Sequence, residues 1–131
     1  MAKRISSLDT IISGYDVILS DVWGVVHNGV DAFPAACAAL AGARKAGATV
    51  VLITNSPRPS PGVISQLQLL GVQDGTYDRI VTSGDVTRHL IAEGPKKVFL
   101  LGPERDMPLF DGLDVQVVGQ DEAEAIVCTG F

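Results

Sequence analysis

Short apolar runs alternate with helical patterns along most of the chain, and this alternation constrains the fold more than any other feature of the sequence. From residue 15 onward, runs of apolar and β-branched residues are separated by segments with apolar residues three to four positions apart, or by short turns. Strands that alternate with helices through short connections form parallel sheets with right-handed crossovers. The sequence therefore predicts an α/β fold in which helices flank a parallel sheet.

The positions of the expected elements follow from the same patterns. Strands are expected at the apolar runs 17–19, 49–53, 80–81, 98–101, 115–118 and 125–128. Helices are expected over 34–46, over 60–70 and from residue 85 to Gly94, with a short helical turn at 122–124. Asp31 and Asp85 are expected to cap the first and third helices, because carboxylates accept hydrogen bonds from the free amides of a first turn. The unbroken run at 49–53 is typical of a strand buried on both faces.

Composition excludes several classes of protein. The chain is 47% hydrophobic and 19% charged, which is typical of a folded globular protein, and its net charge of −5 argues against nucleic acid or an anionic membrane as the main partner. It has neither a run long enough to span a bilayer nor the apolar core of a signal peptide. Cys37 and Cys128 stand far apart, outside any Cys/His cluster, so we expect a cytoplasmic protein without disulfides or zinc.

Asp21 is the first candidate for chemistry. It directly follows the first expected strand, which we take to be buried, and ligand sites of parallel sheets lie at the carboxyl ends of the strands. A carboxylate there can attack phosphorus if a divalent cation such as Mg²⁺ offsets the repulsion between the two anions. On spacing alone, a turn-capping role for Asp21 is at least as compatible with its position, because aspartate is common in turns.

Thr54 and Asn55 follow the second expected strand in the same manner. A hydroxyl and neighbouring amides at this point can hold a transferring phosphoryl group and offset its charge. The pair also fits the start of a turn, so the motif is weak by itself. The occurrence of Asp21 and Thr54 at the ends of successive parallel strands favours a phosphate site.

Two stretches of the sequence resemble a known family. Ser-Asp-Val-Trp-Gly-Val-Val-His-Asn-Gly at 20–29 and Ile-Thr-Asn-Ser-Pro-Arg-Pro at 53–59 resemble the first two motifs of the haloacid dehalogenase (HAD) superfamily, and most closely those of its class IIA, which includes NagD-like and 4-nitrophenylphosphatase-like enzymes. Residues 80–85 and 98–103 also resemble that class. The resemblance implies the N-terminal part of a Rossmannoid HAD-like core over residues 1–84 and the beginning of a C2-type α/β cap over residues 85–131.

The resemblance also implies an activity and a set of site residues. The activity is Mg²⁺-dependent hydrolysis of a small phosphorylated metabolite through an aspartyl-phosphate. Asp21 would be the nucleophile and a metal ligand, and the backbone carbonyl of Trp23 would be a second ligand. Thr54 would be a catalytic, phosphoryl-binding residue, with Asn55 and Gly24 also at the phosphate. Residues 24–31 would form a flap over the site.

The sequence departs from the family pattern in two respects. Trp23 stands where the family's phosphatases usually carry a second Asp as general acid and base, a role that indole cannot perform, so good leaving groups should be favoured. The Lys and Asp motifs that follow the cap in the family are not found. We therefore expect an N-terminal half with weak or no activity by itself.

Other readings remain open. A variant of the same chemistry would attack carbon, as dehalogenases do, although Thr54 and Asn55 favour phosphate. A reading of a different class is a non-catalytic HAD-like fragment or pseudoenzyme that acts as an association module or homo-oligomer, because a truncated sheet exposes apolar surface and a free edge. A dinucleotide-binding domain is excluded because no GxGxxG follows the first strand.

Overall fold

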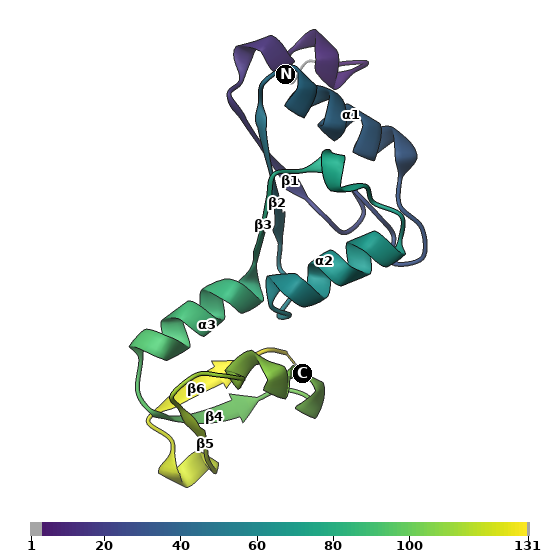
Figure 1. Cartoon of the computed structure of the whole chain (residues 1–131). Coiled ribbons are helices and arrows are strands. Elements are labelled where there is room, and N and C mark those ends of the chain that lie inside the picture. Colours follow the sequence, from purple (N-terminus) through teal and green to yellow (C-terminus); the bar gives the residue numbers. More distant parts are fainter. Residues whose placement is uncertain (1–3, 131) are drawn as a thin grey trace. The chain divides into compact units, whose positions relative to one another are not determined.

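The computed structural model of the chain describes residues 4–130 and divides into two compact units (Figure 1). Unit 1 comprises the described residues up to Thr54 together with Pro61–Val81. Unit 2 comprises Asn55–Ser60 and the described residues from Thr82 onward. Each unit is built on a three-stranded sheet. The predicted α/β class, with parallel strands and flanking helices, is confirmed.

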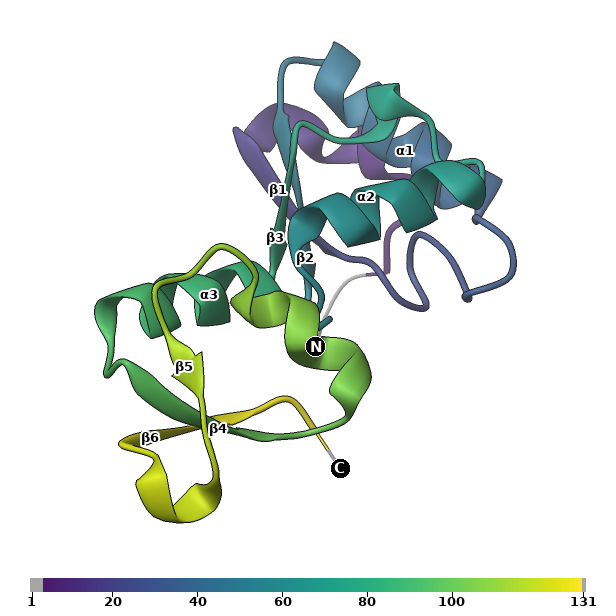
Figure 2. The same ribbon diagram turned by 60° about the horizontal axis from the view of Figure 1, so that its bottom comes forward.

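Unit 1 contains the first three strands in the order β1-β2-β3. Its two α-helices lie on the same side of these strands (Figure 2). Its elements are β1 (Val17–Asp21), α1 (Pro34–Lys45), β2 (Thr49–Thr54), α2 (Ser60–Leu69) and β3 (Arg79–Thr82), with 3-10 turns at Leu8–Thr10, Ile12–Gly14 and Asp74–Thr76. Strands β1 and β2 pair in parallel, in a register that places Asp21 beside Ile53. The carboxyl ends of β1 and β2 therefore lie at the same edge of the sheet.

The two faces of this sheet differ in burial among the described residues. Val50 and Leu52 are fully buried, in a cluster with Leu40 of α1 and Leu67 of α2. On the other face, which we call the exposed sheet face, Val17, Leu19, Ile53 and Val81 are 49%, 66%, 41% and 41% exposed. The expectation of a buried first strand and of a second strand buried on both faces is therefore wrong for the described residues, because α1 and α2 contribute apolar side chains to one face only.

Two predicted helix caps are also wrong. Phe33 occupies the cap position of α1 without a side-chain hydrogen bond, and Pro34 at the first position has no amide hydrogen to satisfy. Asp31 lies further upstream, where its own amide donates to Asn28 Oδ1 at 2.8 Å. At α3 (Ser83–Glu93) the cap is Thr82, whose Oγ1 accepts from the Asp85 amide at 2.9 Å. Asp85 Oδ1 instead accepts from the amide of Ser60, the first residue of α2.

Unit 2 places the remaining strands in the order β5-β4-β6, and both pairs are parallel. After α3 come β4 (Lys97–Leu101), a 3-10 segment at Glu104–Phe110, β5 (Gln116–Val117), a 3-10 turn at Gln120–Glu122 and β6 (Ala125–Cys128). Ile91, Val98 and Val127 form part of a second core. Arg88 donates to the carbonyls of Leu109 and Asp111 at 2.7 and 2.8 Å, which fastens α3 to the 3-10 segment.

Cys37 and Cys128 are free thiols. Burial raises the pKa of the Cys37 thiol, which disfavours the nucleophilic thiolate. No helix between residues 4 and 130 has the length and apolar character needed to cross a membrane.

Candidate active site

Asp21 ends β1 with its side chain in solvent. Its Oδ1 accepts a hydrogen bond from the Val22 amide at 2.7 Å, and the Ser20 hydroxyl donates to the Asp21 carbonyl at 2.9 Å. The local bond with Val22 is of the kind that an aspartate in a turn makes. The same bond restricts the side chain, so the carboxylate is both oriented and accessible, as a nucleophile or a metal ligand requires.

Thr54 ends the neighbouring strand, one position beyond the residue that pairs with Asp21. It is only 8% exposed, in contrast to Asp21. The structure thus brings the ends of β1 and β2 together, as the sequence predicted. Asn55 belongs to unit 2, so the structure relates Asp21 to Thr54 and not to Asn55.

The loop that follows Asp21 is anchored by two buried valines. Val22 is 2% exposed and Val26 is fully buried, and the Val26 amide donates to the Val22 carbonyl at 2.8 Å. Gly24 and Gly29 adopt φ angles of 75° and 91°, which L-residues rarely adopt. The predicted flap is therefore a folded loop with fixed turns at its two glycines.

Trp23 and His27 pack against each other on this loop. Trp23 is 61% exposed, and its ring meets that of His27 edge to face, with centroids 5.4 Å apart. His27 is buried, with only 3% of its surface exposed. Its Nδ1 accepts from the Gly29 amide at 2.9 Å, which places the proton of the neutral ring on Nε2. Burial lowers the pKa of His27, so this residue is a poor replacement for a missing general acid.

Gly29 is a constituent of this arrangement that sequence reasoning missed. A Cβ atom built on Gly29 would lie 2.5 Å from Cη2 of Trp23 and 2.6 Å from Cζ3. The benzo ring of Trp23 therefore occupies the space that any side chain at position 29 would need. The recurrence of glycine five residues after Gly24 was the available signal.

The oxygen donors near Asp21 suit a hard divalent cation in part. The Asp21 carboxylate and the Trp23 carbonyl are oxygen ligands of the kind that coordinate Mg²⁺ in proteins. Mg²⁺ is often coordinated by only one or two carboxylates, with water molecules and substrate phosphate oxygens as its other ligands. Within residues 4–130, no three His, Cys, Asp or Glu side chains gather to form a complete cation cage. The donors present therefore fit a cation that is shared with a phosphate.

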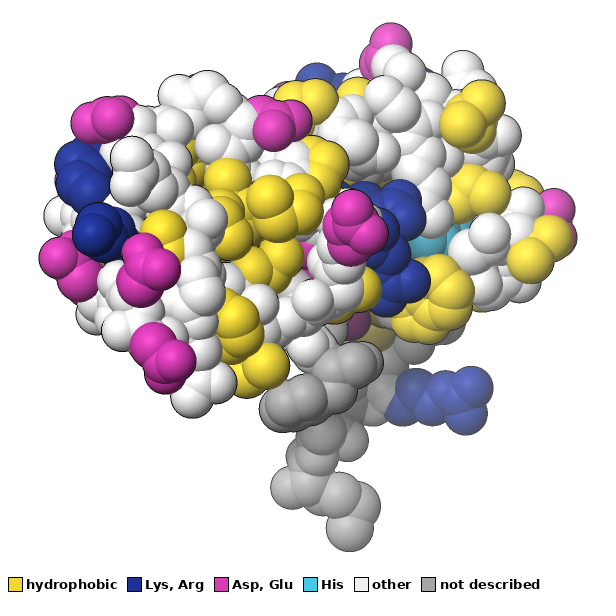
Figure 3. Space-filling view, turned by 90° about the horizontal axis from the view of Figure 1, so that it is seen from below, with side chains coloured by type: hydrophobic (Ala, Val, Ile, Leu, Met, Phe, Trp, Pro, Cys, Tyr) yellow, Lys and Arg dark blue, Asp and Glu magenta, His cyan; other side chains and the backbone are white. Residues whose placement is uncertain are grey.

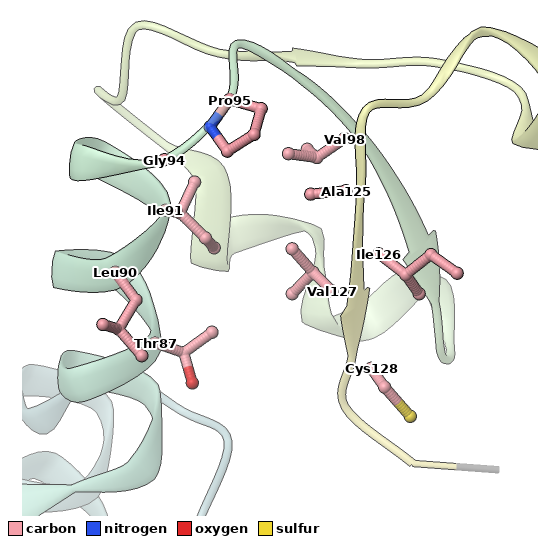
Figure 4. Close-up of a pocket in the computed structure, with 10 residues that line it drawn as sticks. All are labelled: Thr87, Leu90, Ile91, Gly94, Pro95, Val98, Ala125, Ile126, Val127 and Cys128. Atoms are coloured by element: carbon pink, nitrogen blue, oxygen red, sulfur yellow. The ribbon is translucent and has the colours of Figure 1, made fainter.

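A separate cavity lies within unit 2, between α3 and β6, and has a volume of about 260 Å³ (Figure 4). It is lined by Thr87, Leu90, Ile91, Gly94, Pro95, Val98, Ala125, Ile126, Val127 and Cys128. The cavity lining offers no carboxylate, imidazole or cation, so it lacks the groups for phosphate chemistry.

Apolar side chains also form a patch among charged ones on the face seen in Figure 3.

Comparison with known proteins identifies relatives of the chain. A family model described as haloacid dehalogenase-like hydrolase matches residues 18–116. No curated protein matches the chain. Among solved structures, a hydrolase of the haloacid dehalogenase-like family from Brucella suis 1330 is 56% identical, with a TM-score of 0.90 over 96% of this chain and 48% of that one.

Two solved phosphatases are more distant. A glycerol phosphate phosphatase from Mycobacterium tuberculosis, in complex with calcium, is 26% identical, with a TM-score of 0.65 over 90% of this chain and 36% of that one. A 4-nitrophenylphosphatase from Thermotoga maritima shares the fold at 20% identity and a TM-score of 0.69, over 90% of this chain and 46% of that one. The chain thus spans half or less of the length of these solved relatives.

Proposed function

The chain belongs to the haloacid dehalogenase-like hydrolase family, and from this premise we propose that it carries the nucleophile half of a phosphate monoester hydrolase. One observation carries the proposal: the exposed carboxylate of Asp21 ends β1 beside the end of β2, where Thr54 lies. The Mycobacterium tuberculosis relative, a phosphatase, supports phosphate as the group transferred. The proposed substrate is a small phosphorylated metabolite in the cytoplasm.

The proposed chemistry assigns a role to each residue of the site. An Asp21 carboxylate oxygen forms a bond to phosphorus while the bond from phosphorus to the ester oxygen breaks, and water then hydrolyses the aspartyl-phosphate. The Thr54 hydroxyl, with the backbone at Asn55 and Gly24, holds the phosphoryl oxygens. A bound Mg²⁺ would offset the charge between carboxylate and phosphate. The M. tuberculosis phosphatase is also known in complex with magnesium, which supports that cation.

The whole protein's activity requires more than these residues. Because the described part of the chain has no group of three or more His, Cys, Asp or Glu side chains that could hold a metal ion, we propose that residues 1–131 alone have weak or no activity. The assignment of residues 1–84 to a core and 85–131 to a cap is part of the same proposal. It is supported by the division of the described residues into two units, because unit 2 begins at Thr82 apart from the short segment Asn55–Ser60.

The test is hydrolysis of p-nitrophenyl phosphate by the chain, with and without Mg²⁺, beside Asp21→Asn. Metal-dependent turnover that this substitution abolishes would support Asp21 as the nucleophile. Turnover equal in the two proteins would contradict it. If neither protein hydrolyses p-nitrophenyl phosphate, a second measurement uses Mg²⁺ and beryllium fluoride, which mimics a phosphoryl group on aspartate. Binding of beryllium fluoride that is lost in Asp21→Asn supports the proposal. No binding of beryllium fluoride to the unsubstituted chain overturns it.

A second candidate function is a non-catalytic association module, which forms homo-oligomers or binds a partner. The exposed sheet face favours it, because Val17, Leu19, Ile53 and Val81 present apolar surface from three neighbouring strands. Parallel sheets are normally covered on both faces, so such a surface favours association. Sedimentation of the chain over a range of concentrations tests this candidate.

A further inference from the structure

Trp23 is a large aromatic side chain that the fold holds in place without burying it. It lies two residues after Asp21 and is 61% exposed. Gly29 leaves room for its benzo ring, and the His27 ring stands against it edge to face. The backbone supports the same arrangement, since the Gly24 amide donates to the His27 carbonyl at 2.8 Å. The exposed indole surface is therefore oriented before any ligand arrives.

An oriented and exposed aromatic surface is suited to ligand binding. A side chain that is already fixed loses little conformational entropy when it contacts a ligand. Val25 and Val30, on the same loop, are 42% and 76% exposed and add apolar surface. The loop that follows Asp21 thus presents several exposed apolar side chains close in sequence to the proposed nucleophile.

The chemistry of the loop points to the same kind of ester. Indole is not a proton donor of useful acidity, and His27 is 3% exposed with Nδ1 bonded to the Gly29 amide, so neither protonates a departing oxygen. Without a proton from this loop, esters whose alcohol departs readily as an anion are favoured. Phenols, with pKa values of about 10, do so more readily than aliphatic alcohols. An aromatic leaving group can also stack on Trp23.

We propose that Trp23 is the recognition surface for the leaving group and that the site prefers phosphate esters of phenols to those of aliphatic alcohols. The inference rests on the proposed function, because it places the phosphate at Asp21. Trp23 then binds the alcohol portion of an ester from a position two residues after the proposed nucleophile.

The test compares phenylphosphonate with methylphosphonate, two analogues that cannot be hydrolysed, as ligands of the chain in the presence of Mg²⁺. Calorimetry gives both dissociation constants, and fluorescence reports on the ring directly because Trp23 is the single tryptophan. We expect phenylphosphonate to bind roughly two- to tenfold more tightly and to change the Trp23 emission. Trp23→Ala should abolish the preference, so that the ratio of the two dissociation constants falls to about one. Leu69→Ala, which removes an 89% exposed side chain from α2, should retain the preference.

The outcomes separate this inference from the proposed function. If methylphosphonate binds and phenylphosphonate binds no better, the phosphate site stands and the role of Trp23 is overturned. A preference that survives in Trp23→Ala overturns it as well. If neither phosphonate binds, the phosphate site itself fails, and the inference fails with it.

Discussion

The indole ring of Trp23 lies against Gly29, in the space where the Cβ atom of any other residue at position 29 would be. This contact and the buried side chain of His27 together hold the conformation of the loop that follows Asp21. The orientation of Trp23 therefore depends on a glycine six residues away, and the dependence can be measured.

Gly29→Ala should destabilise the chain by about 1–3 kcal/mol, because φ at this position is 91° and the new methyl group would displace the indole. Chemical denaturation gives the free energy of unfolding, and Trp23 emission reports the displaced ring. Gly62→Ala is the matched control. Gly62 lies in α2 with nothing within 4 Å of an added Cβ, so alanine there should stabilise by about 0.5–1 kcal/mol. Equal effects of the two substitutions would contradict the role of Gly29.

His27 should make the chain less stable in mild acid. Burial lowers its pKa below the ordinary value of 6.5, so the unfolded state binds the proton more readily than the folded state. The contribution of His27 is constant above the unfolded pKa, and stability is lost as pH falls from that value toward the lowered folded pKa. Unfolding free energies measured from neutral pH to about pH 5 test this. His27→Asn, which keeps an acceptor for the Gly29 amide, should flatten the dependence.

The control for the pH experiment is the other histidine. His89 is 71% exposed, and its Nε2 lies 3.6 Å from the Glu93 carboxylate. His89→Gln should therefore leave the acid sensitivity unchanged. An acid sensitivity that persists in His27→Asn but disappears in His89→Gln would show that the wrong histidine has been assigned.

Asp78→Asn should lower the thermal midpoint, because Asp78 joins α1 to the sheet. Its Oδ1 accepts from Arg44 Nε and its Oδ2 from the Val50 amide, both at 2.8 Å. The Arg44 guanidinium, followed by the Val50 amide, holds the pKa of Asp78 below its ordinary value, so this stabilisation is present above the unfolded pKa and is lost as pH falls through the folded one. We expect the wild type and Asp78→Asn to converge in acid. Asp114→Asn, at a 97% exposed position, should change little.

Leu19→Lys should reduce self-association of the chain if the exposed sheet face is an interface. Leu19 is 66% exposed on β1, and a charge there opposes burial against a second copy. Sedimentation should show the weight-average mass of the wild type rising with protein concentration. For Leu19→Lys the same rise should require at least about a tenfold higher concentration, and a tenfold change corresponds to about 1.4 kcal/mol of association free energy. Leu69→Lys, at an 89% exposed position on α2, is the control. A wild type that stays monomeric would exclude the homo-oligomer.

Much of the fold could be predicted because it depends on local patterns. The spacing of apolar residues located α1 at Pro34–Lys45 to within one residue, and the apolar run at Ala125–Cys128 is β6. The alternation of strands and helices predicted the parallel pairing of β1 with β2. That pairing placed Asp21 and Thr54 at the ends of neighbouring strands. These features follow from side-chain periodicity and chain connectivity, and both can be read from a single sequence.

The tertiary structure decided what the local patterns leave open. Thr82, and not Asp85, caps α3, because the segment at Ser60 offers its amide to the Asp85 carboxylate. His27 is buried in a loop where the Gly24 amide bonds to its carbonyl and the Trp23 ring lies against its imidazole, contacts that no spacing rule reveals. One face of β2 is buried and the other is less covered, since burial depends on which helices reach the sheet and not on the run of apolar residues itself. Periodicity determines where an element forms, whereas caps, burial and the position of the Trp23 ring depend on contacts between segments distant in the chain.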